Sequence, residues 1–244
     1  MNKEIWFESW FDTNFYHELY KNRDEDEANI FIENLINKLE LDPCSEVLDL
    51  ACGKGRHALK MSNYFQKVTG IDLSKNSINI AKKFNKENLK FLTGDMRNFS
   101  LNKKFDFIFN LFTSFGYFEN FNDNSLVLDN CNKHLKKNGL IVIDYLNPEK
   151  VINNLVKNEI KIVNKTKYTI SRKIENNFII KDIYINQKNK EKHFYEKVQL
   201  INLKMFSEIL KKSNFTINKT FGNYNLEEYN ENSNRLIITA LKNN

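Results

Sequence analysis

Residues 47–58 read VLDLACGKGRHA, an apolar run that passes into a turn with two glycines and then into a helical pattern. A strand that feeds such a turn leaves backbone N–H groups exposed and lets a ligand approach the chain closely. The spacing Gly53-x-Gly55-x-x-Ala58 also fits a dinucleotide fingerprint, although that pattern is weak when it stands alone. The stretch therefore predicts a nucleotide-like ligand at the end of a strand, without saying which one.

Short apolar strands and helical patterns alternate on both sides of this turn. Strands are predicted at 46–50, 67–71, 89–92, 105–109 and 140–145, and helices at 3–20, 24–39, 56–65, 74–84 and 124–136. Such alternation predicts a parallel sheet that helices cover on both faces. We therefore expect an open, doubly wound α/β fold.

The pattern changes after Pro148. Residues 159–202 alternate apolar and polar side chains between Asn-rich turns, which predicts antiparallel hairpins. A helix at 203–212 and strands at 215–221 and 236–241 follow. We expect one domain over 1–244, with an N-terminal helical lid (1–42), a cofactor-binding core (43–148), a β-rich insert (149–202), and a closing helix and β-hairpin (203–244).

The composition of the 244 residues is that of a globular chain, with 41% hydrophobic and 28% charged residues. No apolar stretch approaches the roughly 18 residues that cross a bilayer, and we expect no secretory signal and no membrane partner. Three cysteines without a Cys-x-x-Cys pair argue against a disulfide framework and a zinc site, so we expect a cytoplasmic protein without a metal. The net charge is +6, but the lysines are dispersed, so we interpret them as a solvated surface.

Acidic side chains end three successive predicted strands. A carboxylate at Asp49 would repel a pyrophosphate and attract an ammonium group, and S-adenosylmethionine carries an amino-acid end and no phosphate. Asp72 and Asp95 each follow 23 residues after the acid before them. We predict that Asp72 accepts from ribose hydroxyls and Asp95 from an adenine amino group, with Met96 over the ring. One such Asp is more often a turn residue, but three together indicate a ligand.

Four segments together resemble the class I S-adenosylmethionine-dependent methyltransferases: 48–55 (LDLACGKG), 70–74 (GIDLS), 94–96 (GDM) and 105–110 (FDFIFN). The resemblance implies a mixed sheet of seven strands whose last strand is antiparallel, with S-adenosylmethionine as the cofactor. It implies a cofactor-binding set of Tyr16, Tyr20, Asp49, Ala51, Gly53, Gly55, Arg56, Asp72, Leu73, Asp95, Met96 and Asn110. Many members have glycine at the position of Ala51, and we expect a methyl group to be tolerated there with a negative φ.

The β-rich insert and the aromatic N-terminal segment further resemble the small-molecule branch, which includes amino-sugar and glycine N-methyltransferases. In-line methyl transfer to an amine or a hydroxyl mainly requires alignment of two centres, so a strong base is optional. We expect the acceptor beside the loop 110–118, where Tyr117 is a candidate catalytic residue. Asp144, at the end of the fifth strand, is a second candidate, with turn capping as its alternative role. His193 would be a general base if the insert folds over the pocket.

Two other functions stay open at this stage. An RNA or DNA methyltransferase would use the same core, but the fourth strand ends in Asn110-Leu111-Phe112-Thr113 and not in an Asn-Pro-Pro-aromatic box. No appended RNA-binding module is visible either. A non-catalytic protein that retains the cofactor fold would show the same motifs. The sequence also leaves the methyl acceptor undefined and a homodimer open.

Overall fold

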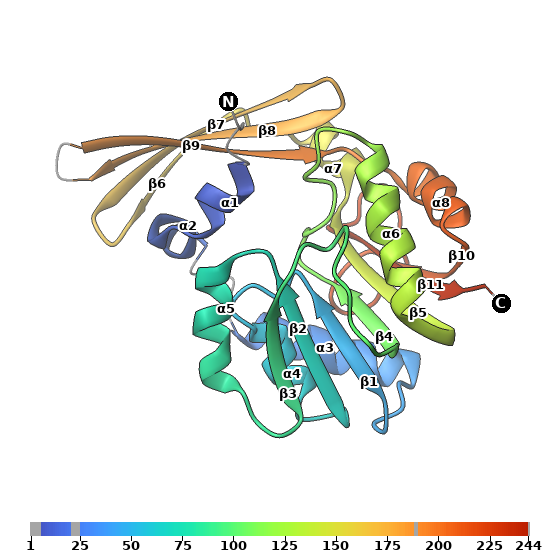
Figure 1. Ribbon diagram of the computed structural model, residues 1–244. Helices are drawn as coiled ribbons and strands as arrows, with labels where there is room; N and C mark the ends of the chain where they lie inside the picture. Colours follow the sequence, from blue (N-terminus) through green and yellow to red (C-terminus); the bar gives the residue numbers. More distant parts are fainter. Residues whose placement is uncertain (1–5, 21–24, 188–189, 244) are drawn as a thin grey trace.

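A mixed seven-stranded sheet forms the centre of the computed structural model, which describes residues 6–20, 25–187 and 190–243 (Figure 1). The strand order is β10-β11-β5-β4-β1-β2-β3. The parallel strands are β1 (Glu46–Leu50), β2 (Lys67–Asp72), β3 (Leu89–Thr93), β4 (Phe105–Asn110) and β5 (Leu135–Leu146). The last strand, β11 (Arg235–Lys242), is antiparallel to both β5 and β10 (Phe215–Phe221). The predicted doubly wound fold and its antiparallel last strand are confirmed.

Helices cover both faces of this sheet. One face packs against α6 (Asn122–His134) and α8 (Leu203–Lys212), and the other against α3 (Glu25–Leu39), α4 (Arg56–Met61) and α5 (Lys75–Ala81). Within β1, Leu48 joins the first core and its neighbour Val47 joins the second, because successive strand residues point to opposite faces. Burial on both faces explains why the strands read as continuous apolar runs. The connecting helices η1 (Lys82–Phe84) and α7 (Pro148–Asn153) are short.

Several element boundaries differ from the prediction. The helix expected over 3–20 is divided, within the described residues, into α1 (Trp6–Phe11) and α2 (Asn14–Leu19). Thr13 is extended and its side chain accepts from the Tyr16 N–H, so it starts a new helix. The helix expected to reach residue 65 ends at Met61. Strand β5 begins at Leu135, five residues before the prediction, because Leu135 is extended and pairs with Phe105.

A second, antiparallel sheet follows the core and confirms the predicted hairpins. Its strands are β6 (Asn158–Val163), β7 (Thr166–Glu175), β8 (Phe178–Gln187) and β9 (Lys190–Gln199), in that order. The turn residues Asn164, Lys165, Asn176 and Asn177 all have positive φ. Two consecutive left-handed residues suit a tight hairpin, which explains the asparagines at these turns.

The helices α1 and α2, residues 6–20, form a segment that we call the strap. It lies between the second sheet and α5 (Figure 1). Trp6, Trp10 and Leu19 pack in one cluster with Tyr168, Ile170, Ile183 and Ile185 of the second sheet. Glu196 of β9 accepts hydrogen bonds from Trp10 Nε1 at 2.8 Å and from the Tyr20 hydroxyl at 2.6 Å. Among the described residues, no helix has both the length and the apolar character needed to cross a membrane.

Candidate functional site

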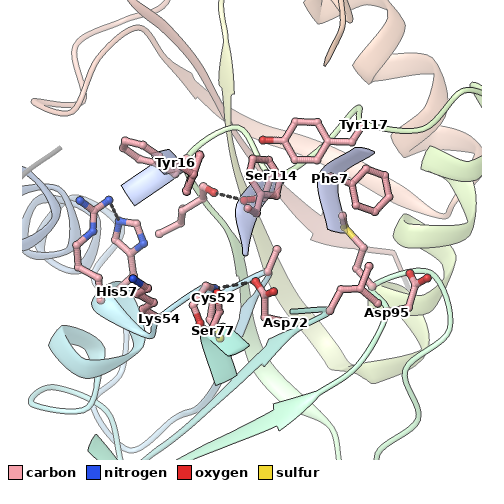
Figure 2. A pocket seen from close by; sticks show the side chains of 18 of the residues that line it. Phe7, Tyr16, Cys52, Lys54, His57, Asp72, Ser77, Asp95, Ser114 and Tyr117 are labelled. Atoms are coloured by element: carbon pink, nitrogen blue, oxygen red, sulfur yellow. Dashed lines mark hydrogen bonds between the residues drawn. The ribbon is translucent and has the colours of Figure 1, made fainter. Parts of the chain in front are cut away.

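A pocket of about 310 Å³ lies beyond the carboxyl ends of β1, β2 and β3 (Figure 2). This is the edge of an open α/β sheet at which ligands bind. Its wall has four parts. The turn after β1 contributes Ala51, Cys52, Gly53, Lys54, Arg56 and His57. The ends of β2 and β3 and the start of α5 contribute Asp72, Leu73, Ser77, Gly94, Asp95, Met96 and Arg97. The loop after β4 contributes Leu111, Phe112, Ser114, Tyr117 and Phe118, and the strap contributes Phe7, Phe11, Tyr16, His17 and Tyr20.

The two glycines of the first turn have different roles. Gly53 lines the pocket with φ 54°, and a Cβ added there would meet no protein atom within 4 Å, so the open side of this residue faces ligand space. Gly55 has φ 84°, and an added Cβ would lie 2.5 Å from Phe91 Cζ. Gly55 therefore allows the turn to pack closely on β3. It was predicted to contact the cofactor, but it does not line the pocket.

Ala51 lines the pocket as predicted, but its backbone conformation was predicted wrongly. Its φ is +62°, in the left-handed region, whereas we expected a negative value. A residue with a Cβ costs roughly 1–2 kcal/mol in that region, because the Cβ approaches the following carbonyl oxygen. The turn thus keeps the shape that glycine would adopt and accommodates the strain of the alanine methyl group.

Asp49 lies behind this turn and does not line the pocket. Its side chain is 1% exposed and accepts a hydrogen bond from the Ala58 backbone. The second carboxylate oxygen, Oδ2, is buried and has no hydrogen-bond partner among the described residues. Burial, and secondarily the charge of Asp72, raises the pKa of Asp49 to about 7. A buried carboxylate in this condition is stabilised by a cation in the adjacent pocket.

Asp72 lines the pocket where β2 ends, as predicted. Its Oδ2 accepts from the Gly53 N–H and its Oδ1 from the Ser74 N–H, both at 2.8 Å. Burial raises the pKa of Asp72, and these two hydrogen bonds work against the rise. Each oxygen keeps a second lone pair, so the fixed carboxylate can still accept from two hydroxyl groups of a ligand. Leu73 lines the pocket beside it.

Asp95 and Met96 also line the pocket, but the Asp95 carboxylate is already paired. Arg97 Nη2 donates to Asp95 Oδ2 at 2.6 Å, and Arg97 Nε lies 3.1 Å from both oxygens. Although burial favours a higher value, these bonds lower the pKa of Asp95. Arg97 also lies over the Phe118 ring, 5.0 Å from its centroid. Arg97 was not among the predicted site residues, and its sequence signal is an arginine two residues after the acid.

The strap and the loop after β4 bring three predicted tyrosines to the pocket. Tyr16, Tyr20 and Tyr117 all line it. The Tyr117 ring packs against Trp6 and Phe11 of the strap, with centroids 5.3 and 5.5 Å apart, so its position depends on the strap being in place.

Two histidines that were not assigned to the site also line the pocket. Burial, followed by the charge of Lys54, lowers the pKa of His17 to about 4. Burial and Arg56 lower the pKa of His57 to about 3, and Arg56 Nη2 lies 3.4 Å from its ring nitrogen Nε2. Arg56, from the predicted set, lines the pocket too. Both imidazoles are neutral at pH 7, so they contribute polar atoms without adding positive charge.

Asp144 was predicted as a catalytic candidate, but it is a buried structural anchor that does not line the pocket. Its Oδ1 accepts from Arg235 Nε at 2.7 Å, and its Oδ2 from the Phe112 N–H at 2.8 Å and the Tyr224 hydroxyl at 3.2 Å. Phe112 and Thr113 have φ of 67° and 57°. The carboxylate therefore fixes a strained loop that forms part of the pocket wall.

His193 and Asn110 do not reach the pocket either. His193 pairs with Tyr184 across β8 and β9, on the face opposite to Ile183 and Ile185, which pack on the strap. It stacks on Tyr184 at 4.5 Å, and its Nε2 lies 2.9 Å from Asp182. The prediction of a general base was wrong because strand alternation turns the ring outward. Asn110 Nδ2 donates to the Leu50 carbonyl at 3.1 Å, so it joins β4 to β1.

Comparison with known proteins agrees with this geometry. The family profile described as "Methyltransferase domain" matches residues 47–139. Residues 47–139 are therefore similar to methyltransferase domains. They include β1 to β4, the glycine turn and all three acids at the strand ends.

The relatives found by sequence match part of the chain. A dTDP-3-amino-3,4,6-trideoxy-alpha-D-glucopyranose N,N-dimethyltransferase of Streptomyces venezuelae is 30% identical over 41% of this chain and 42% of its own. A demethylmenaquinone methyltransferase of Thermotoga maritima is 39% identical over 45% of this chain and 47% of its own. The matches thus span less than half the length of these relatives.

The fold likeness extends through nearly the whole chain. The crystal structure of an S-adenosylmethionine-dependent methyltransferase from Clostridium acetobutylicum superposes with a TM-score of 0.81, covering 94% of this chain and 97% of that one at 20% identity. The likeness of fold therefore extends well beyond residues 47–139.

Replacing Ala51 by glycine should stabilise the protein. We expect the Ala51→Gly variant to gain about 1 kcal/mol in the free energy of unfolding, because glycine adopts a positive φ without strain. Urea unfolding followed by circular dichroism measures it. Ala58→Gly in α4 is the comparison variant and should lose more than about 1 kcal/mol, because it has a lower helix propensity and loses a fully buried methyl group. Equal losses in both variants would contradict strain at Ala51.

Replacing Asp144 by alanine should lower the stability of the folded protein. Asp144→Ala leaves the Arg235 guanidinium without its buried partner, and we expect a loss of about 3–5 kcal/mol in the free energy of unfolding. Asp144→Asn keeps an oxygen acceptor and should lose less. Denaturant titration of both variants measures the difference. Wild-type stability in Asp144→Ala would contradict the anchoring role.

Proposed function

We propose that the chain is an S-adenosylmethionine-dependent methyltransferase that methylates a small molecule, in the cytoplasm. The observation that carries the proposal is the fixed Asp72 carboxylate beside the open side of Gly53. Behind the turn lies Asp49 Oδ2, which has no hydrogen-bond partner in the described part of the chain. These two carboxylates fit a ligand that has hydroxyl donors at one point and positive charge at the next. A pyrophosphate would bring its negative charge toward two carboxylates. The three cysteines are free thiols, which is compatible with a reducing compartment.

The residues present assign parts of the cofactor to parts of the pocket. Asp72 would accept from the ribose hydroxyls, and the Gly53 turn would receive the amino-acid end, whose ammonium group is attracted by the charge of Asp49. Met96 and Leu73 offer apolar surface for the adenine ring. Because Arg97 occupies the Asp95 carboxylate, Asp95 offers at most its remaining lone pairs to the adenine amino group. When bound, the cofactor supplies a methyl group on a positively charged sulfur.

The acceptor is proposed to be an amine or a hydroxyl of a small molecule, with an amine favoured. Support comes from the relatives, several of which are named as amino-sugar N,N-dimethyltransferases. Aromatic side chains of the strap and of the loop after β4 exclude water around the acceptor space. Tyr117 is the catalytic candidate that lines the pocket, where its hydroxyl can orient the acceptor.

Methyl transfer here depends mainly on alignment and on the charge of the site. An amine must be neutral to attack, and the neutral imidazoles of His17 and His57 are compatible with that state at pH 7. Asp49 and Asp72 stabilise positive charge near the turn. After transfer, the methylated nitrogen carries the charge and loses its proton to water. The chain thus binds and orients the reactants and excludes water, and it does not need to supply a strong base.

An acceptor screen tests the proposal directly. The full chain is incubated with methyl-labelled S-adenosylmethionine and panels of amines, amino sugars, phenols, thiols and carboxylic acids, with transfer RNA and duplex DNA as further arms. We expect labelled product from a small-molecule amine. Labelled nucleic acid alone, or cofactor binding with no acceptor in any arm, would overturn the proposal.

Replacing Asp72 by alanine tests the cofactor assignment. Asp72→Ala should weaken cofactor binding by about 1–3 kcal/mol, because hydrogen bonds to a charged acceptor are lost.

Cofactor affinity should rise with pH. The Asp49 pKa of about 7 belongs to the ligand-free protein, and a bound cation stabilises the carboxylate and lowers that pKa. Affinity is therefore full above about pH 8 and falls by up to about tenfold per pH unit below about 7. Asp72, whose pKa is also raised, adds to the same trend, and Arg56, which lowers the Asp49 pKa, works against it.

Isothermal titration calorimetry between about pH 5 and pH 8 measures this dependence. Asp49→Asn is the matched control, since it keeps the shape of the side chain and cannot titrate. It should bind more weakly and with a flatter pH profile. Affinities that do not change with pH in the wild-type protein would contradict the electrostatic role of Asp49.

A further inference from the structure

Asp12 lies between α1 and α2 and connects the strap to the core. Its carboxylate accepts a hydrogen bond from Ser74 Oγ and another from Asn76 Nδ2, the latter at 3.1 Å. Ser74 and Asn76 belong to the start of α5, which lies on the other side of the strap from the second sheet (Figure 1). Asp12 is therefore a point at which the strap is fastened to the cofactor-binding core.

Ser74 is hydrogen bonded in three directions. Its Oγ accepts from the Ser77 N–H at 2.9 Å, which caps α5, and its backbone N–H donates to Asp72 Oδ1 at 2.8 Å. A hydroxyl has a single hydrogen, and that hydrogen goes to Asp12. The strap carboxylate and the Asp72 carboxylate are thus held by one residue. A shift of Ser74 would move both.

We propose that Asp12 is a positioning residue that seats the strap over the pocket through Ser74 and so retains the bound cofactor. The inference rests on the proposed function for the identity of that cofactor. Five strap residues line the pocket, Phe7, Phe11, Tyr16, His17 and Tyr20, so the seating of the strap sets how tightly that side of the pocket encloses a ligand. Because Ser74 bonds to both carboxylates, strap closure and binding at Asp72 are coupled, and the coupling acts in both directions.

The contacts on the other side of the strap indicate which parts separate when the hydrogen bonds of Asp12 break. Trp10 stacks on Phe194 with centroids 4.8 Å apart, and its Nε1 donates to Glu196. Tyr168 of β7 donates to Glu18 at 2.6 Å. On the core side, the strap makes the two bonds at Asp12 and packs Trp6 and Phe11 on Tyr117 of the loop after β4. We expect the strap to stay on the second sheet, with the opening on the side of α5 and Tyr117.

The dissociation rate of S-adenosylmethionine tests the proposal. In stopped-flow displacement with the full chain, Asp12→Ala should release the cofactor about tenfold faster or more, the range expected when hydrogen bonds to a charged acceptor are lost. Asp12→Asn keeps an oxygen that accepts from Ser74 and should stay within about threefold of the wild type. Glu208→Ala, which removes an exposed carboxylate of α8, is the control and should not change the rate.

Tryptophan quenching gives a second readout that needs no cofactor. The two tryptophans of the chain, Trp6 and Trp10, both lie in the strap, and Trp6 contacts Tyr117 of the core loop. In the ligand-free protein, acrylamide should quench Asp12→Ala more than the wild type, with Asp12→Asn unchanged. A melting curve establishes that each variant is folded. If Asp12→Ala does not fold, Asn76→Ala, which removes the second bond alone, takes its place, with an expected acceleration of about threefold.

The outcomes separate this inference from the proposed function. If the wild type does not bind S-adenosylmethionine, the proposed function fails, and the quenching comparison still decides whether Asp12 seats the strap. If the wild type binds and a folded Asp12→Ala or Asn76→Ala variant shows wild-type release and wild-type quenching, the positioning role of Asp12 is wrong.

Discussion

The hydrogen bond from the Gly53 N–H to the Asp72 carboxylate holds the site together. It joins the turn after β1 to the end of β2, which are adjacent parallel strands, and it fixes both partners at once. The turn must present its backbone outward to make this bond, which requires positive φ at Ala51, Gly53 and Gly55. The carboxylate in turn is held with its remaining lone pairs toward the pocket. The geometry of the ligand site is thus a consequence of how two neighbouring strands end.

The core could be predicted from sequence because its signals are local. Strands buried on both faces read as apolar runs, and the acid at each strand end stands in a fixed relation to that run. Parallel strands place these ends on one edge of the sheet, so residues 46–95 predicted most of one wall of the pocket. The hairpins of the second sheet could be predicted equally well from the sequence, because tight turns with positive φ favour asparagine.

The remaining errors concern contacts between distant parts of the chain. Nothing near Asp144 in the sequence shows that Arg235, 91 residues away, occupies its carboxylate. The alternation of β9 was visible, but which face would meet the strap was not, so His193 was assigned to the wrong side. Arg97 was missed although its partner Asp95 is local, because the sequence does not show that the arginine turns back onto that acid. Local patterns specify elements, and side-chain roles depend on tertiary neighbours.

The same division explains how the pocket is built. One wall comes from the strand ends within residues 47–139, where backbone hydrogen bonds fix each acid. The other wall comes from the strap, which rests on the second sheet and contributes rings rather than backbone. A rigid charged wall suits a constant ligand, whereas an aromatic wall on a separate sheet can change with the acceptor without disturbing the first.

Asp49 shows that this arrangement has a stability cost. A buried carboxylate oxygen without a partner costs about 1–3 kcal/mol or more, and folding alone gives no reason to retain it. Such exceptions concentrate at functional sites, where binding supplies the missing partner. A ligand with positive charge beside the turn would offset this cost. Binding would then stabilise the protein by more than the direct contacts between ligand and protein alone provide. Asp49 Oδ2, which has no hydrogen-bond partner among the residues that the structure describes, is thus explained by attraction between its charge and a cationic ligand on the other side of the turn.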